Sequence, residues 1–152
     1  MDHPHSPPAA AAIGGQPIHS MLVQFPVVCF TLALVTDLAY WSTEDLMWHH
    51  FSSWLLFAGL VFGGLAAIAG IIDFLFRRDL RAHRPAWPHA LGSLIVLLLA
   101  LANSFVHAGD GWTAIVPWGI VLSAATVVVM IVSDWFGRAL VFRYGVGVRD
   151  DG

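Results

Sequence analysis

The sequence predicts an all-α integral membrane protein, a bundle of four transmembrane helices. Of its 152 residues, 58% are hydrophobic and only 11% are charged, which is too apolar for an ordinary soluble domain. A chain this short cannot bury so much apolar surface in one core. A helix needs about 20 apolar residues to cross about 30 Å of hydrocarbon. Four apolar runs approach or exceed that length, and the predicted spans are 21–41, 51–76, 90–106 and 113–132.

The basic residues predict the orientation of the chain. There is no Lys, and all seven basic residues are Arg. They follow the second and fourth runs: Arg77, Arg78, Arg81, Arg84, Arg138, Arg143 and Arg149. Arg beside a span stays cytoplasmic, so we expect both termini and the 77–89 loop on the cytoplasmic side, with the loops 42–49 and 107–112 outside. The Arg cluster is a topology and lipid-headgroup signal, not a nucleic-acid interface.

Residues 1–16 precede the membrane domain, which covers 17–148. Their Pro, Ala and Gly content predicts a disordered tail. Within the first span, Pro26 removes a helix hydrogen bond and predicts a kink. In the acidic loop after this span, Ser42 or Thr43 is expected to cap the turn. One face of the first span carries His19, Val23, Pro26, Phe30, Ala33 and Asp37.

The second span has small residues along one face. Gly and Ala on such a face let neighbouring backbones approach closely in lipid. We therefore expect this helix at the centre of the bundle, with Asp73 pointing inward. The line consists of Ser52, Leu56, Gly59, Gly63, Ala66, Gly70 and Asp73.

The third and fourth spans each carry a small or polar line as well. On the third span the line is His89, Ser93, Val96, Ala100, Asn103 and His107. Its two His are five helical turns apart, about 27 Å, so one lies at each membrane surface. On the fourth span the line is Gly119, Ser123, Thr126, Met130 and Ser133. The basic, amphipathic stretch 135–144 then predicts a helix along the inner surface.

Matching the four lines by depth predicts two polar clusters. The inner cluster contains Asp73, His89 and His19, with Arg77 close by. The outer cluster contains Asp37, His107, Asn103 and either His49 or His50. Ionisable residues inside a membrane are costly and indicate function, although an Asp–His hydrogen bond near a surface can also be purely structural.

Two functions are compatible with these clusters. In the first, two His on different helices ligate a b-type haem at each surface. The inner pair is His19 with His89, and the outer pair is His50 with His107. In the second, the protein is a scaffold or a small proton or ion transport component, or it holds a single metal ion. The candidate cofactor-binding residues are His19, His50, His89 and His107, with Asp37, Asp73 and Asn103 as polar partners. No catalytic residue is assigned, so an enzyme is not established.

Several segments also carry a family likeness: IHSMLVQFP at 18–26, Asp37, the glycine pattern at 59–73, His89 after the Arg-rich loop, and GRALVFRYGVGV at 137–148. Together they resemble the domain-of-unknown-function 2231 family of predicted bacterial membrane proteins, over about residues 17–148. The resemblance implies a four-span inner-membrane protein without established activity. Relatives that look fused to iron–sulfur or cytochrome c domains imply a redox partner. We therefore expect a haem-b-type electron-transfer or redox-partner subunit in the lipid bilayer, and self-association is compatible with this role.

Overall fold

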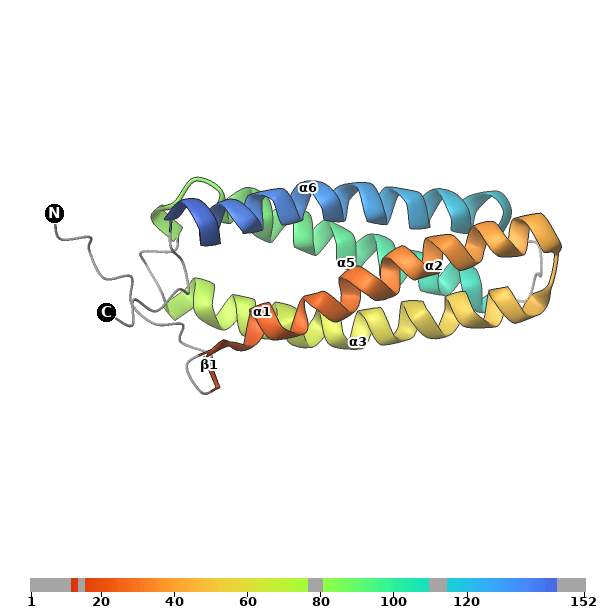
Figure 1. The fold of residues 1–152 in the computed structure, drawn as a ribbon, viewed down its shortest axis with the longest axis horizontal. Helices are drawn as coiled ribbons and strands as arrows, with labels where there is room; N and C mark the ends of the chain where they lie inside the picture. Colours follow the sequence, from red (N-terminus) through yellow and green to blue (C-terminus); the bar gives the residue numbers. More distant parts are fainter. Residues whose placement is uncertain (1–11, 14–15, 77–80, 110–114, 145–152) are drawn as a thin grey trace, which may run out of the picture.

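The computed structural model describes residues 12–13, 16–76, 81–109 and 115–144. Four long helices run side by side along one axis and alternate in direction (Figure 1). They are α2 (Gln24–Thr43), α3 (Leu46–Phe76), α5 (Ala86–Ala108) and α6 (Ile120–Tyr144), with the short α1 (Ile18–Leu22) before α2 and the π-helical η1 (Ile115–Gly119) before α6. Four helical segments are long and apolar enough to cross a membrane. The predicted all-α, four-span class is confirmed.

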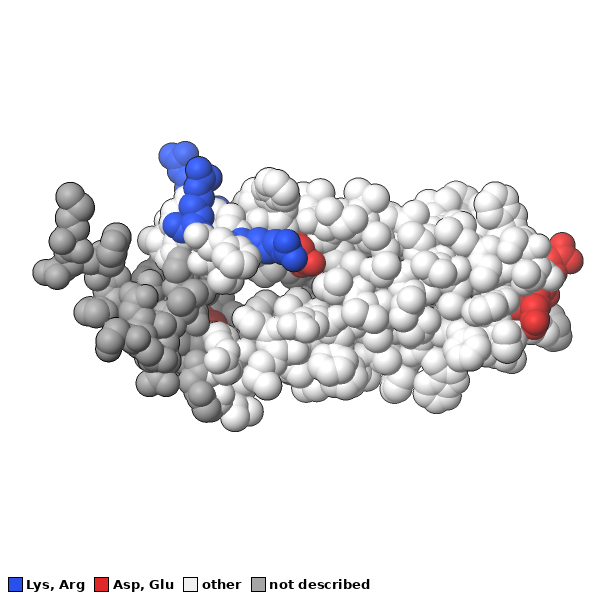
Figure 2. All heavy atoms as spheres, in the orientation of Figure 1, with Lys and Arg blue, Asp and Glu red and all other residues white. Residues whose placement is uncertain are grey.

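The helices form a ring in which each long helix has two neighbours. Both α2 and α5 pack on α3 and on α6, and α1 packs on α3. The start of α1 and the end of α6 lie at the same end of the bundle (Figure 1). Arg side chains gather at this end, whereas the opposite end carries acidic side chains (Figure 2). We call the first of these the basic end, which carries Arg81, Arg84, Arg138 and Arg143. The opposite end is the acidic end, which carries Glu44 and Asp45.

The turn between α2 and α3 is tightly defined. Glu44 ends α2 in the left-handed conformation, at φ 57°, and its N–H donates to the Tyr40 carbonyl at 2.7 Å. Thr43 Oγ1 accepts from the Asp45 N–H at 3.3 Å, as its expected capping role requires. Asp45 Oδ1 in turn accepts from the Met47 N–H at 2.9 Å. This cap explains why α3 begins five residues before the predicted span.

The predicted kink of the first span corresponds to a local irregularity at Val23, which nevertheless keeps helical dihedral angles of φ −63° and ψ −22°. α1 ends at Leu22 and α2 begins at Gln24. Pro26 has no N–H to donate to the Leu22 carbonyl, so the break falls one turn before it. Ahead of α1, β1 (Ala12–Ile13) pairs antiparallel with β2 (Gln16–Pro17), within the stretch expected to be disordered. The other tail residues lie outside the described ranges.

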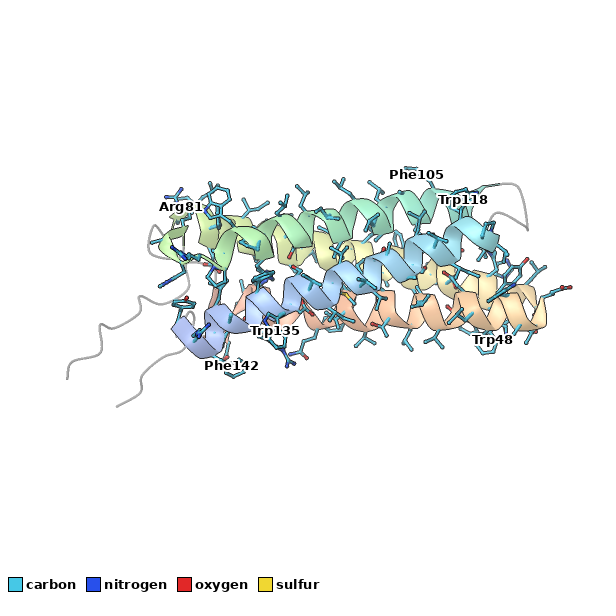
Figure 3. The ribbon with its side chains drawn as sticks, turned by 90° about the horizontal axis from the view of Figure 1, so that it is seen from above. Trp48, Arg81, Phe105, Trp118, Trp135 and Phe142 are labelled. Carbon is cyan, nitrogen blue, oxygen red and sulfur yellow. The ribbon has the colours of Figure 1, made fainter. Side chains whose placement is uncertain are left out.

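The fourth helix is longer than its apolar run. α6 continues to Tyr144, so the stretch 135–144 extends the helix and is not a separate surface helix. No proline interrupts it. Trp135 and Phe142 point away from the bundle near the basic end (Figure 3), and their exposed fractions are 75% and 84%. Exposed aromatic residues suit the membrane interface.

The inward faces predicted from the sequence are largely confirmed. Gly70 is only half-buried, and Ala69 is buried beside it. A Cβ added at Gly59 would overlap the Phe30 ring, and one at Gly63 would lie 2.8 Å from Leu97 Cδ2. The small residues therefore permit close helix contact, as expected. Midway between the ends lies an apolar core, which consists of Phe30, Ala33, Leu56, Val96, Ala100 and Met130.

Candidate functional sites at the two ends of the bundle

Near the basic end, two imidazoles from different helices face each other. His19 comes from α1 and His89 from the first turns of α5. Their ring centroids are 5.9 Å apart and their planes differ by 85°. The sequence predicted this pairing from depth alone, and the structure brings the two rings together.

The same nitrogen of each ring is held by a backbone carbonyl. Nδ1 of His19 lies 2.8 Å from the Ala66 carbonyl oxygen, and Nδ1 of His89 lies 3.0 Å from that of Ser133. A carbonyl oxygen can only accept, so each Nδ1 carries the hydrogen. Neither Nε2 makes a hydrogen bond within the described part of the chain. Each Nε2 therefore presents a lone pair whenever its ring is neutral.

A serine pair fixes the His89 ring further. The Ser133 hydroxyl donates to the His89 carbonyl at 3.1 Å and lies 3.3 Å from its Nδ1. Ser93 Oγ is 3.1 Å from Ser133 Oγ. Because these contacts link α5 to α6, the ring orientation is set by helix packing as well as by its own rotamer.

Two glycines make room for the imidazoles. A Cβ on Gly70 of α3 would lie 3.0 Å from His19 Nδ1, and one on Gly137 of α6 would lie 2.9 Å from His89 Cε1. Contacts this short force a neighbour to move. Each ring of the pair thus lies against a bare stretch of helix backbone.

A cavity of about 60 Å³ adjoins the pair and extends toward the apolar core. Its polar lining comes from His19, Ser93, Ser133 and Asp134. The remaining lining is mainly apolar: Val23, Pro26, Val27, Phe30, Gly63, Ala66, Ala67, Val96, Leu97 and Met130. The cavity therefore combines one imidazole, that of His19, and a few other polar groups with an apolar body, as small-molecule and cofactor sites commonly do.

Near the acidic end, a different network surrounds Asp37, which is fully buried. Its Oδ1 lies 2.9 Å from His107 Nε2, and its Oδ2 accepts from the Ser123 hydroxyl at 2.5 Å. Asn103 Nδ2 donates to Ser123 Oγ at 2.7 Å. His107 Nδ1 lies 3.0 Å from the Asn103 carbonyl oxygen. Three helices thus meet at one carboxylate.

His49, and not His50, lies against His107. The His49 and His107 rings are parallel within 6° with centroids 5.8 Å apart. His50 is exposed, and its ring centroid is 5.7 Å from that of His49. Both nitrogens of His107 already have partners in the chain. The arrangement at this end is a hydrogen-bonded network, and the proposed haem pair His50–His107 is not brought together.

The hydrogen-bond partners of His89 at the basic end differ from those that the sequence predicted. Asp73 is buried as predicted, but the hydrogen bonds of the His89 ring go to Ser133. Arg77 lies outside the described residues. The sequence placed Ser133 and Ser123 on the inward line but did not identify them as site residues. Their helical spacing from Met130 and Thr126 was enough to predict the face on which they lie. The hydrogen-bond partners of their hydroxyl groups could not be predicted, because these depend on how α5 and α6 are aligned.

The donor set at the basic end restricts what it can hold. Among the described residues, no group of three or more His, Cys, Asp or Glu side chains is placed to hold a metal ion. Two imidazoles alone are few ligands for a bare ion such as zinc, which usually takes four. A haem brings four nitrogens of its own and needs only the two axial ligands.

The fold and these buried sites define a four-span membrane protein with ionisable side chains inside its bundle. The chain belongs to the family described as predicted membrane protein (DUF2231), whose model matches residues 15–150. The family resemblance seen in the sequence is thereby confirmed. Comparison with curated proteins and with solved structures finds no match.

Proposed function

We propose that the protein is a haem-b-type electron-transfer subunit of the bacterial inner membrane, with His19 and His89 as the two axial ligands. The observation that carries the proposal is the hydrogen-bonding pattern that the two neighbouring rings share. Each ring donates Nδ1–H to a backbone carbonyl, which leaves its Nε2 available, and the two ring centroids are 5.9 Å apart. Metal-bound His in proteins usually has such a second-nitrogen contact, which fixes the tautomer and strengthens the ligand.

The surroundings of the pair also suit this role. A haem with two protein ligands has no open position and would supply one-electron transfer when bound. The Ala66 and Ser133 carbonyls would orient the two ligands, and the apolar lining would keep water away from the site. With the basic end toward the cytoplasm, electrons would be exchanged with a redox protein on that side.

Binding requires the cavity to widen. Ligand pockets span about 300–1,000 Å³, so the present 60 Å³ accommodates only part of a macrocycle. The break at Val23 separates α1 from α2. We infer that the site opens there, because the helix lacks the hydrogen bond that Pro26 cannot donate at this point.

The proposal is tested by the visible spectrum of the full chain, purified in mild detergent from haem-replete cells. We expect a Soret band that shifts on reduction with dithionite and is lost in His19→Ala and in His89→Ala. His50→Ala is the matched control, because this exposed residue should leave the spectrum unchanged. A colourless wild-type protein would overturn the haem assignment. A colourless protein that retains one copper ion per chain would assign the imidazole pair to a metal ion instead.

A further inference from the structure

The network at the acidic end fixes the number of protons on its central pair. His107 Nδ1 faces the Asn103 carbonyl oxygen, an acceptor, so this nitrogen carries a hydrogen. His107 Nε2 lies 2.9 Å from Asp37 Oδ1. If the ring were neutral and the carboxyl ionised, two lone pairs would face each other at this distance. One further proton must therefore lie between the two atoms.

The same conclusion follows from burial. Asp37 and Asn103 are fully buried, and Ser123 and His107 are nearly so. An isolated carboxylate at such a position is strongly disfavoured. The shared proton makes the Asp37–His107 pair neutral overall, whether the pair is imidazolium with carboxylate or imidazole with carboxylic acid. The Ser123 hydroxyl donates to Oδ2 in either case.

The Asp37–His107 pair is connected to the protein surface on the side of the acidic end, but not on the side of the basic end. His49 of α3 stacks on His107, and its Nδ1 is buried without a hydrogen-bond partner in the described part of the chain. Asn103 Oδ1 is likewise buried and unpaired there. Beyond His49 comes the exposed His50. Toward the basic end, the apolar core separates the pair from His19 and His89.

We propose that Asp37 and His107 form a proton-binding site that exchanges its proton with the acidic end of the bundle through His49. Among the described residues, the other titratable groups near this site are His49 and, beside it, Tyr40 and His50. On release, the proton leaves the space between Nε2 and Oδ1 and passes by a bridging water to His49 Nδ1. His49 then yields a proton to bulk water. The unpaired Nδ1 and Asn103 Oδ1 supply polar partners for that water.

This site does not depend on haem at the basic end. The shared proton is observed by nitrogen NMR of the full chain, labelled with ¹⁵N-histidine, in detergent at neutral pH. We expect the ¹⁵N chemical shifts of both His107 ring nitrogens to differ from those of a free neutral imidazole. The shift of Nε2 should show that this nitrogen carries or accepts a proton. Asp37→Asn should abolish the Nε2 signature. Ser123→Ala, a milder change, should shift it if Asp37→Asn does not fold.

The path is tested by transfer of the labelled protein into D₂O. Exchange of the His107 proton should slow in His49→Phe, which keeps an aromatic ring beside Tyr40. The matched variant His50→Phe should exchange like the wild type. A bare, unprotonated Nε2 facing Asp37 would overturn the site. Unchanged exchange in His49→Phe would overturn the path.

Discussion

Gly137 lies directly against the imidazole of His89, so that a Cβ added at Gly137 would lie 2.9 Å from Cε1 of the ring. The ring cannot retreat freely, because its Nδ1 is bonded to the Ser133 carbonyl on the same helix as Gly137. Gly137 therefore sets the position of an imidazole that it does not bond to.

Gly137→Ala should lower haem content and destabilise the protein. Overpacking a filled site costs about 1–3 kcal/mol, which exceeds the gain of about 0.5–1 kcal/mol from replacing Gly by Ala in a helix. The matched control is Gly64→Ala, since no atom outside its own helix lies within 4 Å of that added Cβ. Thermal unfolding in detergent and the Soret absorbance per chain measure both effects. Equal behaviour of the two variants would show that the ring is not confined by Gly137.

The Asp37–His107 pair should be strongly coupled in stability. Removal of one partner of a buried ion pair costs about 3–5 kcal/mol, whereas replacement of both by apolar residues is often much less costly. We expect His107→Leu and Asp37→Leu each to destabilise the bundle severely and the double variant to lose much less than their sum. The free energies of unfolding of the wild type, the two single variants and the double variant, measured in mixed detergent micelles, give this coupling. Additive losses would mean that the two groups are independently solvated.

The near-perpendicular rings predict an electron paramagnetic resonance signature. His19 and His89 have planes 85° apart, so their π orbitals would act on different iron d orbitals and leave those orbitals almost equal in energy. A low-spin ferric haem between them should give a strongly anisotropic signal with one large g value. An ordinary rhombic signal would indicate near-parallel ligand planes, and hence that the two rings rotate relative to each other as the site opens.

The predicted orientation is tested by single cysteines at the two ends. In a Cys29→Ala background, Glu44→Cys should react with an impermeant thiol reagent in intact cells. Arg84→Cys should react only after permeabilisation, because Arg flanking a span remains cytoplasmic. Both side chains are exposed, so accessibility depends on the side of the membrane. The reverse labelling pattern would invert the bundle.

Much of the architecture could be predicted from periodicity. The line from Ser52 to Asp73 and the line from Gly119 to Ser133 are inward faces in the structure, apart from Gly70. Helical periodicity is local, so a single sequence is sufficient to find such faces. Lengths were less predictable: α6 passes through the polar Asp134 to Tyr144, because a helix can leave the hydrocarbon without ending.

The partners of the polar groups could not be predicted in the same way. Depth matched His19 to His89 and Asp37 to His107, but the choice of His49 over His50 depends on the rotation of α3 by one residue, 100° around its axis. The contacts of Gly70 with His19 and of Gly137 with His89 depend on interhelical packing. Glycine spacing alone indicated only close helix contact.

The most direct measurement of the proposed function is the number of b-type haems per chain, from the pyridine haemochrome assay combined with amino-acid analysis. One haem per chain is expected, because within the described residues His19 and His89 are the adjacent imidazoles from different helices whose Nε2 atoms are available, while both nitrogens of His107 are occupied. The value should fall to zero in His89→Ala and remain one in His107→Gln, provided that this variant folds. Zero haem in the wild type, or two haems with one lost in His107→Gln, would contradict the assignment.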